Sequence, residues 1–375
     1  MGKILKNLLF ILFLLLVNVG IVWFVGSLVA EKVFWEKIKK DADDRKTIVV
    51  NKTEQIVVEN NNPPLSKITE KILPGVVKIF FLDERATGNG KMKFPRLELS
   101  GVIVSGDGLI CTILPEQKLS RQRIEVLLSD GRIFTTNEYF EDKFNGLLFI
   151  KIDVDNLPAI PFADVETLAN GEYLIGVGTD YAPFSHVFST VLVKKYVYDF
   201  SVKNRNFLFS DENSEFYILD KKMADDFLGG VGVNFNGFLV GLIGKRDGEA
   251  TFLVPVKNIK MSLDKLIKES KIVYPRLGVY YLMLDEILKM ENGLPVSEGA
   301  MIYVPSGKSS LAMMAGSAGR QAGLLYGDII LAVNDHKVNS KNPLGSVLSK
   351  FKKGDEVVLK VLRGKEEVSL KVKLL

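Results

Sequence analysis

Short apolar runs at close intervals dominate the chain between Ile68 and Val256. Examples are VVKIFF, GVIVS, IEVLL, LLFIKI, YLIGVG, FSTVLVKKYVY and FLVGLIG. The turn dipeptides that separate several of them are Asp107-Gly108, Asp130-Gly131 and Asn236-Gly237. Regular short strands with little helical periodicity between them are typical of an all-β sandwich or barrel. We therefore predict a mainly β domain over residues 66–257.

The N-terminal pattern is different, because residues 7–30 contain no Asp, Glu, Lys or Arg. At about 1.5 Å per residue, a helix of this length spans a bilayer. A cleaved signal peptide is the alternative, but it has a shorter apolar region and small residues flanking the cut, whereas Leu28 and Val29 precede Ala30. We therefore expect an uncleaved transmembrane helix over residues 7–30, preceded by a short tail, residues 1–6.

Two further changes of pattern divide the rest of the chain. Residues 31–65 form a charged stalk that ends in ENNNPPLS, a polar, proline-containing linker. Residues 258–270 predict a connecting helix, since apolar side chains recur at helical spacing at Ile259, Leu263 and Leu266. Residues 271–375 mix strands with two helices, which indicates a second, small α+β domain.

Composition and charge exclude several classes of function. A length of 375 residues allows two or three domains, and a hydrophobic fraction of 47% argues against disorder. The net charge of +4 is mild and no dense basic cluster carries interleaved aromatics, so we do not expect nucleic-acid binding. Cys111 is the only cysteine, so no internal disulfide forms. Histidines, cysteines and carboxylates do not cluster, and we expect neither a metal site nor a cofactor.

The order of these segments resembles the HtrA family of membrane-linked serine proteases. ITEKILPGVVKIF is similar to the family's entry into the first barrel, SGVIVSGDGLICT to its first strands, and DKFNGLLFIKID to the strand that carries the catalytic aspartate. LANGEYLIGVGTDYAPF resembles the start of the second barrel, and ATFLVPVKNIK its closing strand. The resemblance implies a transmembrane anchor, a chymotrypsin-like double β-barrel and a C-terminal PDZ domain.

The same resemblance implies that the catalytic triad is missing. Acyl transfer in this fold uses a serine, a histidine that takes its proton and an aspartate that orients the histidine. The family's histidine position falls on Pro115 in CTILPEQ, its aspartate position on Gly146 and its serine position on Leu228. Asp226 stands where the family has a glycine whose N–H binds the oxyanion, and a carboxylate there would oppose the developing negative charge.

Other residues do not replace these groups in any obvious way. Asp142 lies four strand residues, roughly 13 Å, before the family's aspartate position. His186 matches a loop of the second barrel and His336 lies in the turn NDHKV, so we expect core-edge or surface roles for both. A Ser–Lys dyad with Lys221 or Lys222 would need a nearby serine that LDKKMADD does not position.

The last domain retains the parts of a peptide-binding site. The family's carboxylate-binding loop, whose N–H groups hold a peptide C-terminus while the peptide adds a strand, resembles the residues Arg276, Leu277, Gly278 and Val279. AGRQAGLLYGDIILAVN is similar to a second signature of the family's PDZ domain, a short helix followed by Gly-Asp-Ile-Ile and a strand. The helix PLGSVLSKF would form the other wall of the groove, with apolar candidates Leu344, Leu348 and Phe351. The insertion SGKSSLAMMAG, residues 306–316, would cover or extend this groove.

These observations predict a membrane-anchored, catalytically inactive HtrA-like pseudoprotease. It would bind protein C-termini or unfolded segments through its PDZ domain, as a scaffold or regulator in envelope protein quality control. An active serine endopeptidase of the family is one alternative. A non-catalytic subunit that assembles with active members, following the family's trimeric habit, is another. The resemblance places the N-terminus in the cytoplasm and the globular part outside, whereas the basic residues after the span, taken alone, indicate the reverse.

Overall fold

A computed structural model describes residues 2–44, 65–83, 97–116, 118–119, 122–164, 168–180, 185–197, 207–246 and 250–375. The chain divides into two units, Met1–Asn61 and Asn62–Leu375, and each is described by itself. The part of the predicted stalk from residue 45 to residue 64 lies outside the described residues.

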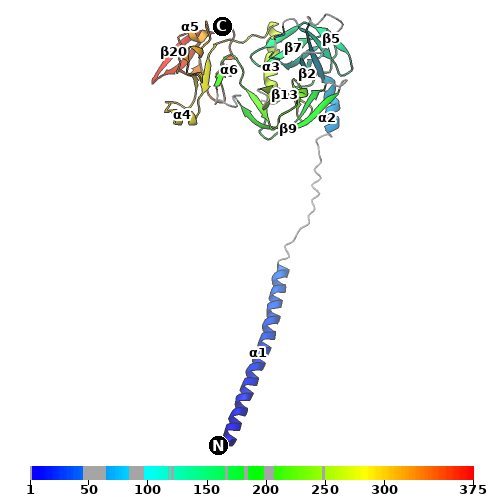
Figure 1. The fold of residues 1–375 in the computed structure, drawn as a ribbon, viewed down its shortest axis with the longest axis vertical. Helices are drawn as coiled ribbons and strands as arrows, with labels where there is room; N and C mark the ends of the chain where they lie inside the picture. The colour runs from blue at the N-terminus through cyan, green and yellow to red at the C-terminus, as the bar shows by residue number, and fades with distance from the viewer. Residues whose placement is uncertain are drawn as a thin grey trace. The chain divides into compact units, whose positions relative to one another are not determined.

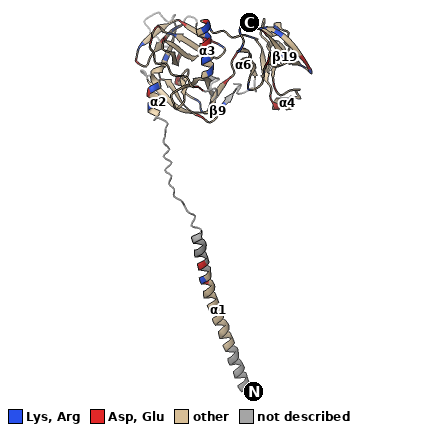
Figure 2. Cartoon of the chain, turned by 180° about the vertical axis from the view of Figure 1, so that it is seen from behind, with Lys and Arg blue, Asp and Glu red and all other residues tan. Residues whose placement is uncertain are grey.

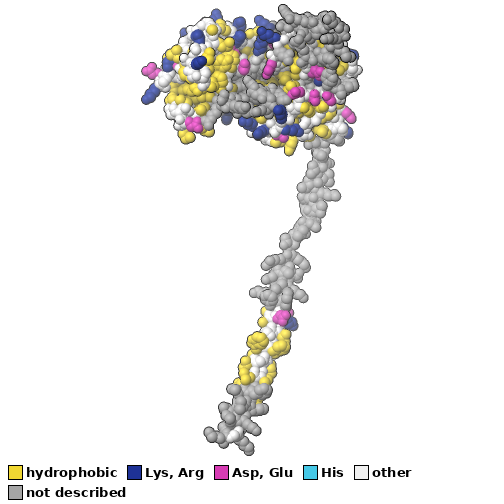
Figure 3. Space-filling model, viewed as in Figure 1, with side chains coloured by type: hydrophobic (Ala, Val, Ile, Leu, Met, Phe, Trp, Pro, Cys, Tyr) yellow, Lys and Arg dark blue, Asp and Glu magenta, His cyan; other side chains and the backbone are white. Residues whose placement is uncertain are grey.

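The first unit contains one helix, α1, over Gly2–Asp44 (Figure 1). Its segment Leu14–Val33 is long and apolar enough to cross a membrane, by length and composition. Every side chain in this segment is exposed. Figure 3 shows apolar side chains along α1, and Figures 2 and 3 show charged residues towards its C-terminal end. A run of apolar side chains with no protein around them fits a signal anchor or a single membrane-spanning helix.

The first barrel begins after the short helix α2, Leu65–Ile72, which buries Ile68 and Ile72. Its sheet has the order β5-β4-β1-β2-β3-β7-β6. The strands are β1 (Val76–Asp83), β2 (Leu97–Ser105), β3 (Leu109–Ile113), β4 (Gln122–Leu127), β5 (Ile133–Thr136), β6 (Tyr139–Asp142) and β7 (Leu147–Lys151). The most apolar strands, such as β3 and β7, are almost wholly buried, because both of their faces are covered.

The second barrel closes on itself in the order β11-β14-β13-β12-β8-β9. Its strands are β8 (Tyr173–Thr179), β9 (His186–Val197), β11 (Phe216–Leu219), β12 (Val231–Val233), β13 (Leu239–Arg246) and β14 (Ala250–Pro255). Strand β12 pairs antiparallel with β13 across the turn that contains Asn236-Gly237, and Gly237 has a positive φ of 78°.

Helix α3 spans Val256–Glu269, where the sequence predicts a connecting helix over residues 258–270, and it buries Ile259, Leu263 and Leu266. It ends where Ser270 adopts the left-handed conformation. Asp142, Asn145, Ser262 of α3 and Tyr274 meet in a buried polar cluster, in which the Asn145 side-chain amide donates to Ser262 at 3.0 Å and to Tyr274 at 2.8 Å. This cluster fixes α3 and the following segment against the first barrel.

The C-terminal domain is built on one sheet with the order β10-β15-β16-β17-β19-β20, and β18 pairs with β17. Its strands are β10 (Phe207–Phe209), β15 (Tyr280–Met283), β16 (Ala300–Ile302), β17 (Ile329–Val333), β18 (His336–Lys337), β19 (Glu356–Arg363) and β20 (Glu366–Lys373). Its helices are α4 (Glu286–Asn292), α5 (Ala318–Gln321) and α6 (Leu344–Leu348). The edge strand β10 precedes β11 in the chain, so a segment between two strands of the second barrel completes this sheet.

Candidate functional site

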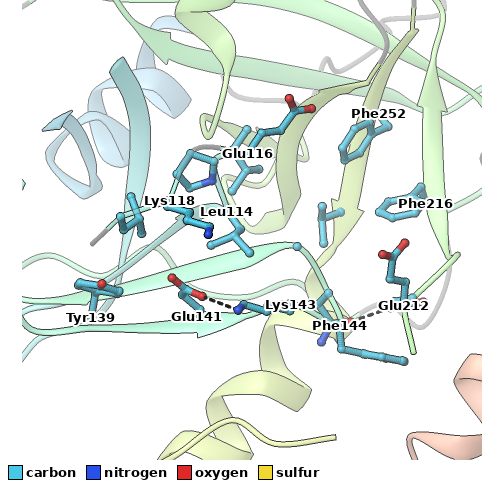
Figure 4. Close-up of a pocket in the computed structure, with 17 residues that line it drawn as sticks. Leu114, Glu116, Lys118, Tyr139, Glu141, Lys143, Phe144, Glu212, Phe216 and Phe252 are labelled. Carbon is cyan, nitrogen blue, oxygen red and sulfur yellow. Dashed lines mark hydrogen bonds and ion pairs between the residues drawn. The ribbon is translucent and has the colours of Figure 1, made fainter. Parts of the chain in front are cut away.

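A cleft of about 730 Å³ lies where the two barrels meet. Loops and strand ends of the first barrel form one side, and strands β11 and β14 form the other (Figure 4). The lining residues are Ile113, Leu114, Pro115, Glu116, Lys118, Leu119, Tyr139, Glu141, Lys143, Phe144, Asn145, Gly146, Glu212, Asn213, Phe216, Phe252 and Val254. Serine, threonine, cysteine and histidine are absent from this set, as far as the structure describes the cleft.

Pro115 and Gly146 face the same cleft, as expected if they occupy neighbouring positions of one site. The N–H of Leu114 donates to the carbonyl oxygen of Gly146 at 2.8 Å, which joins the two segments. Gly146 is exposed and has a φ of 66°, a left-handed conformation that favours glycine. Neither residue has a group that titrates.

Leu228 lies on the turn between β11 and β12, directly after a short 3₁₀ helix, Asp225–Phe227. Its carbonyl oxygen accepts from the N–H of Ser100 on β2 at 2.8 Å. Its half-buried side chain packs against the apolar core of the first barrel rather than lining the cleft. The structure therefore places Pro115 and Gly146 in the cleft and turns Leu228 into the core beside it.

The backbone N–H groups of this turn bond within the barrel. Those of Phe227 and Leu228 donate to Ala224 and Asp225 at 3.2 and 2.9 Å, and those of Gly229 and Gly230 donate to Ile243 and Phe227, both at 2.9 Å. An oxyanion hole needs N–H groups that point at the substrate. From residue 227 to residue 230, every N–H is already paired.

Asp226 contacts this region through its backbone carbonyl oxygen, which accepts a hydrogen bond. Its carbonyl oxygen accepts from the Ser100 hydroxyl at 2.9 Å, and its side chain is half exposed. A Cβ on Gly178 would approach the same carbonyl oxygen to 2.2 Å, so the turn packs directly on β8. The Ser100 hydroxyl of the first barrel therefore joins this turn of the second barrel through the Asp226 carbonyl oxygen.

The charges in the cleft belong to exposed and half-buried side chains. Glu141 pairs with Lys143 at 3.2 Å, and Figure 4 shows both pointing along the wall from β6 and the turn after it. Phe216 and Phe252 stack edge to face on the opposite side, with ring centroids 5.0 Å apart. An apolar, aromatic cleft with a few charges suits binding of a chain segment.

Asp142 is buried within this region but does not face the cleft. Its carboxylate accepts from the N–H of Asn145 at 3.0 Å and from the Asn145 amide at 2.8 Å, and the Ser262 hydroxyl also donates to it. Burial raises the pKa of Asp142 above its usual value, against the hydrogen bonds from Ser262 and Asn145 that lower it. These contacts give Asp142 a structural role.

The C-terminal domain forms the second predicted site, between β15 and α6. The side chains of Leu277, Val279, Leu344 and Leu348 are all buried in one apolar cluster. Gly278 has a φ of 70°, and a Cβ on it would lie 2.6 Å from that of Ser317, so only glycine suits this position. The structure thus brings the predicted loop and helix together.

A carboxylate already lies against the predicted loop, and it belongs to Asp211. Its Oδ1 atom accepts from the N–H of Leu277 at 3.0 Å and from that of Gly278 at 2.9 Å. Arg276 takes no part in this contact through its backbone, which pairs with that of Leu375 at 2.9 and 3.1 Å.

The insertion, residues 306–316, lies on the other side of β15. The N–H of Tyr280 donates to Ala312 at 2.8 Å, and the N–H of Met314 donates to Gly278 at 2.9 Å. Backbone groups alternate in direction along a strand, and the N–H of Val279 faces β10 instead. The insertion therefore extends the sheet away from the groove instead of covering it.

Comparisons with known proteins agree with this architecture. A family profile for the PDZ domain matches residues 299–374. A probable periplasmic serine endoprotease, DegP-like, from Halomonas elongata is 26% identical over 341 residues, which cover 86% of this chain and 67% of that protein. One of the same description from Chlamydia trachomatis is 27% identical over 279 residues, 73% of this chain and 53% of that protein. A solved structure of the HtrA-type protease AlgW with a tripeptide matches 83% of this chain and 97% of that one, with a TM-score of 0.63 and 19% identity.

This chain is similar to HtrA-type serine endoproteases over most of its length. It spans between about half and two thirds of the length of these two sequence relatives. The predicted fold class is confirmed: an N-terminal apolar helix, a chymotrypsin-like double β-barrel and a C-terminal PDZ domain.

The remaining polar candidates lie away from the cleft. His186 begins β9, and burial lowers its pKa. His336 is exposed on β18, with its ring 5.9 Å from that of Phe351 in the PDZ domain. Lys221 and Lys222 are exposed in the loop after β11. None of the four lines the described cleft.

Sequence reasoning missed the segment Phe207–Asp211, which completes the PDZ sheet. Its only local signal is Phe-Leu-Phe followed by Ser-Asp, an apolar run too short to distinguish a strand from a loop. Its partner, β15, lies about seventy residues further along the chain. The pairing of the two strands and the contact of the Asp211 carboxylate with the loop therefore became visible only in the fold.

Proposed function

We propose that this protein is a membrane-anchored, non-catalytic member of the HtrA family that acts by binding protein C-termini through its PDZ domain. It would serve as a scaffold or regulator in envelope protein quality control. The composition of the cleft is the observation that carries the proposal. No serine, threonine, cysteine or histidine lines it in the part of the chain that the structure describes, so the cleft offers neither a hydroxyl or thiol nucleophile of the Ser, Thr or Cys type nor a histidine base.

The turn before β12 supports the loss of catalysis independently of which residues are missing. Acyl transfer needs an oxyanion hole as well as a nucleophile, because the N–H donors stabilise the charge that develops on the substrate. Here the N–H of Leu228 donates to Asp225 at 2.9 Å, and the Leu228 side chain packs in the core. The turn thus serves the packing of the barrels.

Binding is supported by the PDZ domain. PDZ domains hold peptide C-termini through the N–H groups of one loop and the edge of one strand. The loop Leu277–Val279 directs N–H groups at a carboxylate, and Gly278 supplies the left-handed backbone that this arrangement requires. The related AlgW has been solved with a decapeptide and with a tripeptide.

Anchoring and location follow from α1 and from the relatives. The segment Leu14–Val33 has the length and composition of a membrane span. The relatives from Halomonas elongata and Chlamydia trachomatis are described as probable periplasmic proteins. We therefore place the N-terminus in the cytoplasm and residues 65–375 outside the membrane. Protease digestion of intact spheroplasts tests this: the globular part should be cut, and its complete protection would reverse the orientation.

Activity is tested on the detergent-solubilised full chain with a fluorophosphonate probe and with casein. We expect neither labelling nor cleavage, while an active HtrA-type protease assayed in parallel shows both. Binding is tested with a displayed library of peptides that end in free carboxylates, and again after amidation of the selected peptides. Labelling of any serine would restore the protease interpretation. Equal binding of free and amidated peptides would remove the proposed C-terminus recognition.

A further inference from the structure

Strand β10, Phe207–Phe209, occupies the groove that the PDZ domain uses for peptides. It pairs antiparallel with β15, with Phe207, Leu208 and Phe209 opposite Leu282, Tyr281 and Tyr280. The N–H of Ser210 continues the ladder by donating to the carbonyl oxygen of Val279 at 3.0 Å. An added antiparallel strand is how a PDZ domain binds a peptide. Here the added strand comes from the same chain.

The end of this segment meets the carboxylate-binding loop in the matching direction. The chain runs from Phe207 towards Asp211, and Asp211 lies at the loop. Its carboxylate accepts two backbone N–H groups, and the Ser210 hydroxyl accepts a third, that of Val279, at 3.0 Å. The Ser210 hydroxyl also donates to Asp211 at 2.7 Å. A side-chain carboxylate thus takes the hydrogen bonds that a peptide's terminal carboxylate would need.

The apolar part of the groove is filled by the same segment. Leu208 is buried in one cluster with Leu277, Val279, Leu344 and Leu348. All four are residues that the sequence assigns to the peptide site. The pocket for an apolar ligand side chain therefore already holds Leu208.

Aromatic contacts and helix α6 hold the segment from its two sides. Tyr280 stacks on Phe207, with ring centroids 5.5 Å apart, and lies 4.6 Å from the ring of Phe209. On the other side, a Cβ on Gly345 would lie 2.8 Å from the carbonyl oxygen of Glu212. The backbone after Asp211 thus passes directly over the first turn of α6.

We propose that Phe207–Asp211 is an internal ligand of the PDZ groove, with the Asp211 carboxylate in place of a terminal carboxylate. An outside C-terminus then binds only by displacing this segment. The proposal rests on the proposed function, that the groove recognises C-termini. The competing ligand is a peptide with a free C-terminal carboxylate, strand-forming residues before it and an apolar side chain for the Leu208 pocket.

A disulfide across the strand pair tests the occupancy directly. Phe209 and Tyr280 are opposite each other, and their rings lie on one face of the sheet. The Tyr280 backbone bonds towards Ala312, so this pair lacks mutual hydrogen bonds and its side chains lie close. The full-length Phe209→Cys/Tyr280→Cys variant should form an intramolecular disulfide on treatment with oxidised glutathione. Each single variant is the control, and the native Cys111 is fully buried.

Displacement is tested by peptide binding to the same full-length proteins in detergent. The probe is the free-carboxylate peptide library, followed by individual selected peptides labelled with fluorescein. Asp211→Asn should bind selected peptides about tenfold more tightly than the wild type, because it weakens the internal competitor. Asp335→Asn removes the same charge from an exposed turn of the PDZ domain and should bind like the wild type. The oxidised double-cysteine variant should bind at least tenfold more weakly than its reduced form.

The outcomes separate this inference from the proposed function. Absence of the intramolecular disulfide, or a disulfide between two chains, would overturn occupancy by the same chain. Equal binding by the oxidised and reduced forms would overturn the competition. If the disulfide forms but the library selects no carboxylate-dependent peptide, even with Asp211→Asn, the internal contact stands and the C-terminus reader does not.

Discussion

The N–H of Leu114 donates to the carbonyl oxygen of Gly146 at 2.8 Å, so the segments that carry Pro115 and Gly146 lie side by side at the edge of the cleft. This is the arrangement in which a histidine and an aspartate would cooperate if they stood there. The two residues that face the cleft here, Pro115 and Gly146, carry no group that titrates. This contrast leads to the first prediction.

Leu228→Ser alone should not create a hydrolase. The new serine would have neither a base at position 115 nor an orienting carboxylate at position 146. Adding Pro115→His and Gly146→Asp should also fail, since the Leu228 N–H is bonded to Asp225 and an aspartate at 146 would be strained at a φ of 66°. Fluorophosphonate labelling of the single and triple variants measures this. Labelling of the single variant would reveal a base that the cleft does not show.

The glycine pair after Leu228 is expected to matter for stability. A Cβ on Gly229 would come within 2.2 Å of both the Ser100 carbonyl oxygen and the Thr112 hydroxyl, at a φ of 75°. Gly229→Ala should therefore lower the free energy of unfolding by more than about 2 kcal/mol. Gly131, with a φ of 85° and open space around it, is the matched control, and Gly131→Ala should cost about 1 kcal/mol.

The free energy of unfolding of both glycine variants is measured by urea denaturation, with the signal taken from far-ultraviolet circular dichroism. Similar losses at the two positions would mean that the turn beside Leu228 has no special packing role. A much larger loss at Gly229 would explain why a turn typical of a protease persists without its nucleophile.

The sequence predicted the elements whose signals are local. The Asn236-Gly237 turn fixes its hairpin because those residues favour the required backbone, and the spacing of Ile259, Leu263 and Leu266 fixes one buried face of α3. Both predictions needed only neighbouring residues. The loop Leu277-Gly278-Val279 was also selected from its own residues, and its first two N–H groups donate to the Asp211 carboxylate in the structure.

The parts that escaped prediction depend on contacts between distant residues. The side chain of Asp211 looks like an ordinary loop carboxylate in the sequence, and its partners are the N–H groups of residues 277 and 278. The orientation of Leu228 also depends on the barrel core behind it. Hydrogen bonds to backbone N–H groups leave no signature in the residue types of the partner that donates them, so such contacts require the fold.

Cys111 should resist thiol reagents in the folded protein. It is fully buried on β3, and burial raises the pKa of its thiol well above its usual value, so little thiolate forms. We expect negligible labelling by iodoacetamide at neutral pH and one equivalent after unfolding in guanidinium. Rapid labelling of the native chain would show that the first barrel opens. Cys111 would then also be able to form disulfides in the double-cysteine experiment.

Asp142 should make the stability of the protein depend on pH in an unusual direction. Burial raises its pKa in the folded state above the value of about 3.9 that an unfolded aspartate has. The folded state therefore holds the proton more tightly, and the contribution of this group to stability is full below the unfolded pKa and is lost as the pH rises through the folded pKa. Asp142→Asn lacks this dependence. On acidification from neutral pH, the wild type should gain stability relative to Asp142→Asn, measured as the difference between their urea midpoints.

The control is Asp130, whose pKa is lowered by the hydrogen bond from the Arg132 backbone. Above about pH 5, the urea midpoints of Asp130→Asn and of the wild type should differ by a constant amount. The Asp130 carboxyl is ionised there in both the folded and the unfolded protein. A wild type that loses stability relative to Asp142→Asn on acidification would mean that the hydrogen bonds from Ser262 and Asn145 outweigh burial, and that Asp142 is held as a carboxylate.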